Sequence, residues 1–158
     1  MDYQSVVDHF NSIFHGNGSD GLILRERWIA RDGLFDRLSA RFRMAVFTGR
    51  LRWEAELTLK RCAPHLTFAP IIGTDDVTQP KPAPEGLIKI CAECPTQRQW
   101  YIGDTVDDAR CARQAEVPFI GIAAPANPRY DELVRLLKAE KAVAVLDDIN
   151  QLEMVVCA

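Results

Sequence analysis

The sequence lacks the charge and the long apolar runs that would direct it to nucleic acid or to a membrane. Its 158 residues carry a formal net charge of −3, which gives no electrostatic reason to expect nucleic acid or an anionic lipid surface as a partner. No apolar run approaches the roughly 20 residues that a membrane-spanning helix needs. The N-terminus also lacks the basic-then-apolar order of a signal peptide. These absences predict a soluble protein that binds neither nucleic acid nor a membrane.

Cysteine is too scarce and too irregularly spaced for a disulfide framework. The chain has five cysteines, an odd number, and reduced thiols in a cytoplasm fit this usage better than paired ones. Cys91 and Cys94 form a C-x-x-C pair, but no second Cys or His pair stands at the spacing of a zinc site. We therefore interpret these two cysteines as packing residues of a helix.

Short apolar runs alternate with helical patterns along most of the chain. The length suits one domain, and the continuous apolar runs are typical of strands buried on both faces. Strands are expected at 44–47, 68–72, 99–103, 117–122 and 142–146. Helices are expected at 2–14, 52–62, 84–94, 107–115 and 129–140, with one or two more within 22–41 and a final helical turn at 148–154. This order predicts an α/β fold with a Rossmann-like, mostly parallel sheet flanked by helices.

Two carboxylates follow the strand that ends at Gly103. Asp104 comes directly after this turn, and Asp108 lies one helical turn further on the same side. Two acids so placed repel each other unless a cation lies between them, and carboxylate oxygens suit Mg²⁺. A loop followed by an Asp that caps a helix gives the same pattern. This stretch alone does not decide between the two interpretations.

Polar groups also follow two other strands. Thr48, Gly49 and Arg50 come after the strand at 44–47, and Lys81 stands in a loop that three prolines at alternate positions stiffen. A rigid loop with an incidental lysine is the alternative. Because the carboxyl ends of parallel strands share one edge of the sheet, these groups and the two acids are expected to converge there. A hydroxyl, a fixed ammonium and a carboxylate pair that holds Mg²⁺ together suit a phosphoryl group.

Three segments carry a resemblance to a known family. They are MAVFTGR at 44–50, KPAPEGL at 81–87 and YIGDTVDDARCARQAEVPFIGI at 101–122. In this order the chain resembles haloacid dehalogenase superfamily hydrolases, of the phosphoglycolate phosphatase-like subgroup with a small helical cap. The resemblance implies a core at 44–158 and part of the cap at 1–43.

The resemblance also implies a role for each matching residue. Thr48 and Lys81 would be catalytic, Thr48 binding phosphate and Lys81 stabilising the nucleophile and the phosphoryl charge. Asp104 would bind Mg²⁺ and Asp108 would support that metal site. The groups expected to bind phosphate or substrate are Thr48, Gly49, Arg50 and Lys81.

The family's nucleophile motif does not occur before Thr48. The family places an Asp-x-Asp motif after a central strand upstream of the cap, and its first Asp attacks phosphorus. Asp2, Asp8 and Asp20 follow no apolar strand, so the resemblance implies that this chain begins inside the cap. The missing strand would lie between those ending at Thr48 and Asp104. We expect a strand supplied by a second copy or another chain, or a rearranged sheet, because a gap leaves backbone groups without partners.

The expected function is that of a Mg²⁺-dependent phosphatase acting on a small phosphorylated metabolite, with the nucleophile missing from this chain. The alternatives are a non-catalytic phosphate- and Mg²⁺-binding regulatory module, and half of a split phosphatase completed by another chain. One internal candidate for the lost strand is 142–146, which ends in Asp147 and Asp148. We interpret it instead as a last strand followed by an Asp cap.

Overall fold

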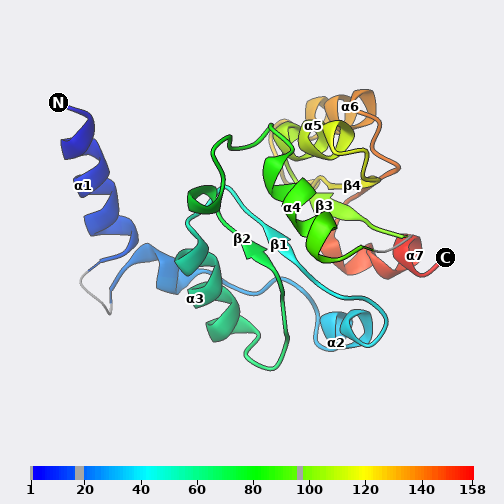
Figure 1. Ribbon diagram of the computed structural model, residues 1–158, viewed down its shortest axis with the longest axis horizontal. Coiled ribbons are helices and arrows are strands. Elements are labelled where there is room, and N and C mark those ends of the chain that lie inside the picture. Colours follow the sequence, from blue (N-terminus) through cyan, green and yellow to red (C-terminus); the bar gives the residue numbers. More distant parts are fainter. Residues whose placement is uncertain (1, 17–19, 96–97) are drawn as a thin grey trace.

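The described residues form parallel strands in the middle of the molecule, with helices on both sides of them (Figure 1). The computed structural model describes residues 2–16, 20–95 and 98–158. Strand β1 (Val46–Phe47) pairs in parallel with β2 (Ile71–Ile72). A second parallel sheet has the order β3-β4-β5 and consists of β3 (Tyr101–Gly103), β4 (Phe119–Ile122) and β5 (Ala144–Leu146). The prediction of an α/β fold with a parallel, Rossmann-type arrangement is confirmed.

The helices begin and end close to the predicted positions, apart from the regions 22–41 and 148–154, the second of which forms η3 and the start of α7. They are α1 (Tyr3–Phe14), α2 (Leu34–Ser39), α3 (Arg52–Cys62), α4 (Glu85–Glu93), α5 (Val106–Gln114), α6 (Tyr130–Ala139) and α7 (Glu153–Val156). Three 3₁₀ turns are η1 (Leu22–Arg25), η2 (Thr74–Asp76) and η3 (Ile149–Gln151). Between η1 and α2 the chain is not helical, so the helical prediction for 22–41 is only partly correct.

Helix α5 shows how local sequence fixes an element of the site. The Thr105 hydroxyl accepts a hydrogen bond from the Asp108 N–H (3.1 Å), and the Asp108 carboxylate accepts one from the Thr105 N–H (3.2 Å). This capping box satisfies two backbone donors at the start of the helix. On the inner face Ala109, Cys111 and Ala112 are fully buried.

The central strand β4 has a core on each face. Phe119 and Ile120 are adjacent residues of β4, and both are buried. Their side chains point to opposite faces of the sheet, because side chains alternate along a strand. Phe119 belongs to a cluster with residues of α4, α5 and α6. Ile120 belongs to a second cluster with α2 and α7, whose buried members are Leu34, Leu38, Leu152 and Val156. The sheet is therefore covered by helices on both faces.

The sheet is interrupted between β1 and β3. Among the described residues β1 pairs only with β2, and β3 is the outer strand of the other sheet, so each has an unpaired edge. Both edges line one cavity of about 700 Å³, through residues 44–47 and 100–102. Among the described residues β1 and β3 do not pair with each other, and the absence of a central strand from this chain stays a prediction.

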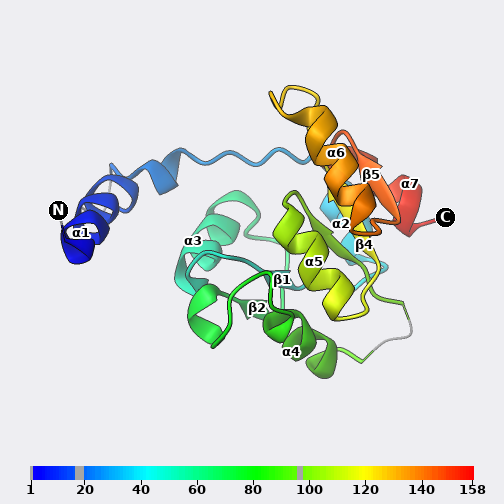
Figure 2. The ribbon, with the colours of Figure 1, turned by 90° about the horizontal axis from the view of Figure 1, so that it is seen from above.

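Helix α1 lies at one end of the molecule, far from α6 and α7 at the other (Figure 2). None of its residues is buried, although Asp2 caps it by accepting a hydrogen bond from the Ser5 N–H (2.9 Å). Helix α2, which also falls in the predicted cap segment 1–43, instead packs into the core. The predicted division at residues 43 and 44 stays a prediction. No helix within the described ranges has the length and apolar character that crossing a membrane requires.

Candidate functional site

Lys81 joins the two halves of the interrupted sheet. Its ammonium donates to the backbone oxygen of Phe47 at the end of β1 (2.9 Å) and to Asp108 Oδ1 in α5 (2.7 Å). The ammonium also lies over the rings of Phe47 and Tyr101, 4.6 and 5.4 Å from their centroids. Only 16% of the Lys81 side chain and 7% of the Asp108 side chain are exposed. The predicted fixed lysine is therefore held in a buried ion pair.

Side-chain hydrogen bonds hold the loop on both sides of Lys81. Before it, the Glu85 carboxylate accepts hydrogen bonds from the backbone N–H groups of Thr78 and Gln79 and from the Lys89 ammonium. Interactions of Glu85 with Lys89 and then with Thr78 and Gln79 lower the pKa of this carboxyl to about 2. After Lys81, the Gln114 side chain donates to the Pro82 carbonyl (2.9 Å). These contacts, together with the prolines, fix the position of the lysine.

Asp108 is surrounded by donors. Besides Lys81, it accepts hydrogen bonds from the Tyr101 hydroxyl (2.8 Å) and from the Thr105 hydroxyl (2.7 Å) and N–H (3.2 Å). Burial raises the pKa of Asp108, but the hydrogen bonds from Lys81 and Thr105 outweigh this and hold it below the ordinary value. Burial, and then the charge of Asp108, raise the pKa of Tyr101, which stays a neutral donor. Gly103 permits this packing, since a Cβ there would lie 2.6 Å from the Asp108 Cβ.

The depressed pKa of Asp108 predicts a loss of stability in acid. A carboxyl whose folded pKa is lowered stabilises the fold above its unfolded pKa, here 3.8, and loses that contribution as the pH falls through the folded value. We expect the free energy of unfolding to fall between about pH 5 and about pH 3 more steeply in the native protein than in Asp108→Asn. Urea unfolding at a series of pH values measures this difference, and parallel curves for the two proteins would contradict it.

Asp104 is the exposed acid of the pair. It directly follows β3, and within the described ranges no hydrogen bond or ion pair reaches its carboxylate. Asp108 differs, because its oxygens already accept from three side chains. The described residues contain no group of three or more His, Cys, Asp or Glu that could hold a metal. Mg²⁺ needs only one or two carboxylates beside waters and phosphate oxygens, so Asp104 fits such an ion. The metal role of Asp108 stays a prediction.

The segment after β1 presents a hydroxyl and an open backbone. The Thr48 hydroxyl accepts a hydrogen bond from the Arg50 N–H (3.2 Å), and this threonine directly follows the carbonyl that Lys81 contacts. At Gly49 no atom lies within 4 Å of where a Cβ would be, so the backbone there is accessible. Thr48 and Asp104 thus follow β1 and β3, which each have one unpaired edge among the described residues, and the Lys81 ammonium contacts Phe47 of β1 and lies over the Tyr101 ring of β3.

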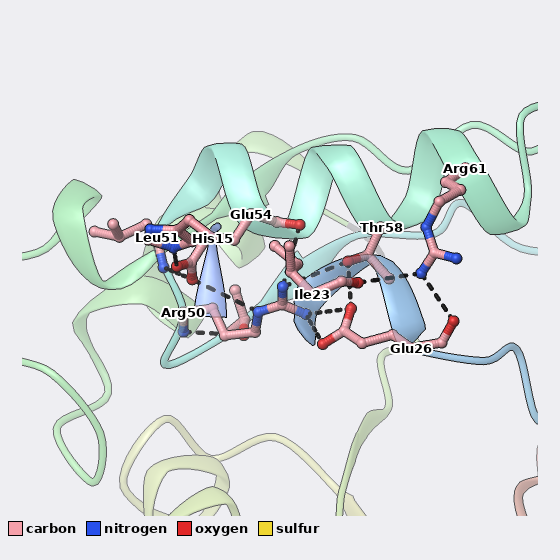
Figure 3. Close-up of polar contacts among 9 residues, drawn as sticks. His15, Ile23, Glu26, Arg50, Leu51, Glu54, Thr58 and Arg61 are labelled. Carbon is pink, nitrogen blue, oxygen red and sulfur yellow. Dashed lines mark hydrogen bonds and ion pairs between the residues drawn. The ribbon is translucent and has the colours of Figure 1, made fainter. Parts of the chain in front are cut away.

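The Arg50 side chain lies in a separate polar cluster (Figure 3). Its guanidinium forms ion pairs with Glu26 (3.0 Å) and Glu54 (3.6 Å), and it lies within 3.4 Å of the Thr58 hydroxyl. Glu54 is buried and also contacts His15. The substrate role predicted for Arg50 requires its guanidinium to leave these carboxylates, and that role stays a prediction. Sequence reasoning missed this cluster, in which the Glu54 carboxylate also accepts a hydrogen bond from the Leu51 N–H at the start of α3 (3.1 Å).

The acids after β5 do not join this site. Asp148 accepts a hydrogen bond from the Asn150 N–H (2.9 Å) and caps η3, as interpreted from the sequence. Asp147 accepts from the Tyr130 hydroxyl (2.8 Å) instead. Strand β5 is separated from β3 by β4, which places it roughly 10 Å from β3. The alternative nucleophile at Asp147 therefore has no support in the geometry.

Comparison with known families agrees with this geometry. A family model described as haloacid dehalogenase-like hydrolase matches residues 32–122, more than half of the chain. The chain belongs to the haloacid dehalogenase-like hydrolase family. The matched segment of this hydrolase family contains Thr48, Lys81, Asp104 and Asp108. A comparison of the sequence with curated proteins found no match.

Solved structures of other haloacid dehalogenase-like proteins share the fold. A conserved protein of this type and of unknown function from Agrobacterium tumefaciens is 19% identical, with a TM-score of 0.69, over 99% of this chain and 78% of its own. A protein from Bacteroides fragilis assigned as a haloacid dehalogenase-like hydrolase is 26% identical, with a TM-score of 0.65, over 75% and 55%. A protein from Lactobacillus delbrueckii subsp. bulgaricus assigned as a phosphoglycolate phosphatase is 20% identical, with a TM-score of 0.63, over 79% and 51%. The chain thus spans about half the length of the last two proteins.

Proposed function

We propose that this chain provides the phosphate- and Mg²⁺-binding part of a phosphomonoesterase site for a small phosphorylated metabolite. The observation that carries the proposal is the largely buried Lys81–Asp108 pair, at 2.7 Å, near the carboxyl ends of β1 and β3, which each have one unpaired edge among the described residues. A buried ammonium held in place can stabilise the charge of a transferring phosphoryl group without reorganisation. The relative assigned as a phosphoglycolate phosphatase lends support from the same fold.

Each residue of the site has a distinct part in this proposal. Lys81 neutralises phosphoryl oxygens, and Asp108 acts through Lys81 by keeping the ammonium in place. Thr48 donates its hydroxyl hydrogen to a phosphate oxygen, and the open backbone at Gly49 leaves room for that group. Asp104 holds Mg²⁺, which when bound supplies further charge stabilisation for the phosphate.

The nucleophile is the part that the described site does not contain. A carboxylate that attacks phosphorus has to lie beside Lys81, and Asp108, the acid found there, is already engaged by three side chains. We infer that the attacking carboxylate comes from a further polypeptide segment, so that this chain acts as half of a split site. All five cysteines are free thiols, which supports a reducing compartment such as a cytoplasm.

A non-catalytic binding module is the second candidate. The observation that favours it is that the described site has groups for phosphate and for a cation but no free carboxylate beside Lys81. Such a module would bind phosphate and Mg²⁺ without turnover, whatever segment is added. Phosphate release in the presence of the missing segment separates the two candidates.

Binding of Mg²⁺ in the presence of inorganic phosphate tests the site that both candidates share. We expect the native chain to bind Mg²⁺ by isothermal titration calorimetry, and Asp104→Asn to bind it at least about tenfold more weakly, since one of few protein ligands is lost. Asp107→Asn is the matched control, because Asp107 is exposed and pairs with Arg110 (3.5 Å). Equal affinity of Asp104→Asn and the native chain would overturn the metal assignment.

A further inference from the structure

The segment that joins η1 to α2 crosses the surface without pairing with a strand. Residues 26–29 belong to no helix, strand or turn, and the chain bends at Ala30 before it reaches α2. Figure 2 shows this segment as an extended blue coil between the two elements. Arg27, Trp28 and Ile29 are exposed, and within the described ranges their N–H groups donate to no acceptor. The segment thus presents free backbone donors, as an edge strand does.

Side chains from two distant parts of the chain hold this segment in place. The Arg61 guanidinium of α3 donates to the Glu26 carbonyl (2.8 Å). At the other end, the Asn150 side chain donates to the Ile29 carbonyl (3.2 Å) and accepts from the Arg31 N–H (2.6 Å). A partner would therefore meet a surface whose backbone is already ordered, which lowers the entropic cost of binding.

The exposed side chains of the segment are basic, with an apolar residue among them. Arg25, Arg27 and Arg31 are exposed, and within the described ranges their guanidinium groups form no ion pair or hydrogen bond. Ile29, which is 75% exposed, lies between the second and third of these arginines. The exposed acid among residues 25–32 is Asp32, so the charge presented to a partner is positive. Carboxylates on either side of an apolar group complement this order of side chains.

We propose that residues 25–31 bind an acidic segment of a partner protein in an extended conformation, with the order acid-x-apolar-x-acid. The two carboxylates pair with Arg27 and Arg31, and the apolar side chain covers Ile29. The backbone carbonyls of the partner accept hydrogen bonds from the free N–H groups of the segment, as in strand addition. This interaction surface is independent of the proposed phosphate and Mg²⁺ site.

Two other occupants fit the surface less well. In this chain the order acid-x-apolar-x-acid occurs at 32–36 and 104–108, and these segments run into α2 and α5. A second copy therefore has no extended segment of the required kind. Nucleic acid offers phosphates but no apolar side chain for Ile29, and the net charge of −3 opposes its approach.

The test uses a synthetic peptide with the order Ser-Glu-Thr-Leu-Thr-Glu-Ser, labelled with fluorescein at its N-terminus. Fluorescence anisotropy measures its binding to the full chain, and a matched peptide carries Gln in place of both Glu residues. We expect the Glu peptide to bind, with an affinity that falls as sodium chloride is added, and the Gln peptide to bind at least about tenfold more weakly. Hydrogen exchange of the N–H groups of residues 27–29 should slow when the Glu peptide is bound.

Two double variants separate this surface from the charge of the whole protein. Arg27→Gln with Arg31→Gln should weaken binding of the Glu peptide at least about tenfold. Arg135→Gln with Lys138→Gln removes the same charge from exposed positions of α6 and should leave the affinity unchanged. Equal losses in the two double variants, equal binding of the two peptides, or no binding of the Glu peptide would overturn the proposal. Stronger binding of a single-stranded oligonucleotide to the same arginines would also overturn it, in favour of nucleic acid.

Discussion

Asp108→Asn is expected to lower the free energy of unfolding by about 3–5 kcal/mol, since removing one partner of a buried ion pair leaves an uncompensated charge. The charge left behind is that of Lys81, whose side chain is only 16% exposed. The variant also weakens the acceptor for the Tyr101 and Thr105 hydroxyls. Urea unfolding at neutral pH, followed by circular dichroism, measures the change. This effect should be among the largest of any single substitution outside the apolar core.

The neighbouring acid provides the control for this prediction. Asp107 is 53% exposed, and its ion pair with Arg110 spans 3.5 Å along one helix. Exposed pairs of this kind contribute about 0–1 kcal/mol, so Asp107→Asn should change the free energy of unfolding by less than that. A loss of the same size in both variants would show that Asp108 has no special structural role. A small loss in both would contradict the buried ion pair.

Phe119→Ala is expected to lower the free energy of unfolding by about 3–5 kcal/mol, the range for removing a buried aromatic side chain. Phe119 is 2% exposed on the central strand, and its ring lies 6.0 Å from that of Tyr101. A cavity at this position also removes support from the Tyr101 hydroxyl, which holds Asp108. We therefore expect both a lower unfolding free energy and a weaker response of stability to acid, measured by urea unfolding at two pH values.

Phe10→Ala is the matched control for the core substitution. Phe10 is 54% exposed on α1, a helix in which no residue is buried. Its stacking on the Phe14 ring, at 5.1 Å between centroids, is a local contact within that helix. The expected loss is below about 1 kcal/mol. Comparable losses for Phe10→Ala and Phe119→Ala would contradict the assignment of the core to the faces of β4.

Helices were predicted from the sequence more closely than strands, for a physical reason. Helix α3 (Arg52–Cys62) coincides with the predicted range because its hydrogen bonds are local and its ends are set by nearby residues. Strand β1 was expected at 44–47 but extends only over Val46–Phe47. Strand pairing depends on a neighbour that the sequence pattern cannot supply, and β1 has one neighbour among the described residues instead of two.

In the candidate site, the positions set by local sequence were predicted, but the side-chain pairs between distant residues were not. The sequence predicted that Lys81 is held in place and that Asp104 and Asp108 follow a strand near a cation. It did not reveal that the Lys81 ammonium pairs with Asp108, 27 residues away in the sequence. Residue types and spacing place groups at one edge of a sheet, but they do not specify which side chains pair there.

The polar cluster around Arg50 could not be predicted from sequence patterns. Glu26 contacts Arg50 across 24 residues, and His15 contacts Glu54 across 39. These contacts tie the segment after α1 to α3, and they depend on how two distant parts of the chain pack together. The six arginines between residues 25 and 43 gave no indication of them, because interspersed basic residues are typical of a solvated surface.

We propose that the site of this chain binds phosphate and Mg²⁺ but that its described residues contain no nucleophile. Release of inorganic phosphate from a generic aryl phosphate by the purified chain, with Mg²⁺ present, tests it most directly. We expect no release above that of Asp104→Asn measured beside it. Mg²⁺-dependent release by the native chain that disappears in Asp104→Asn would overturn the proposed division of the site, because a nucleophile would then lie within these 158 residues.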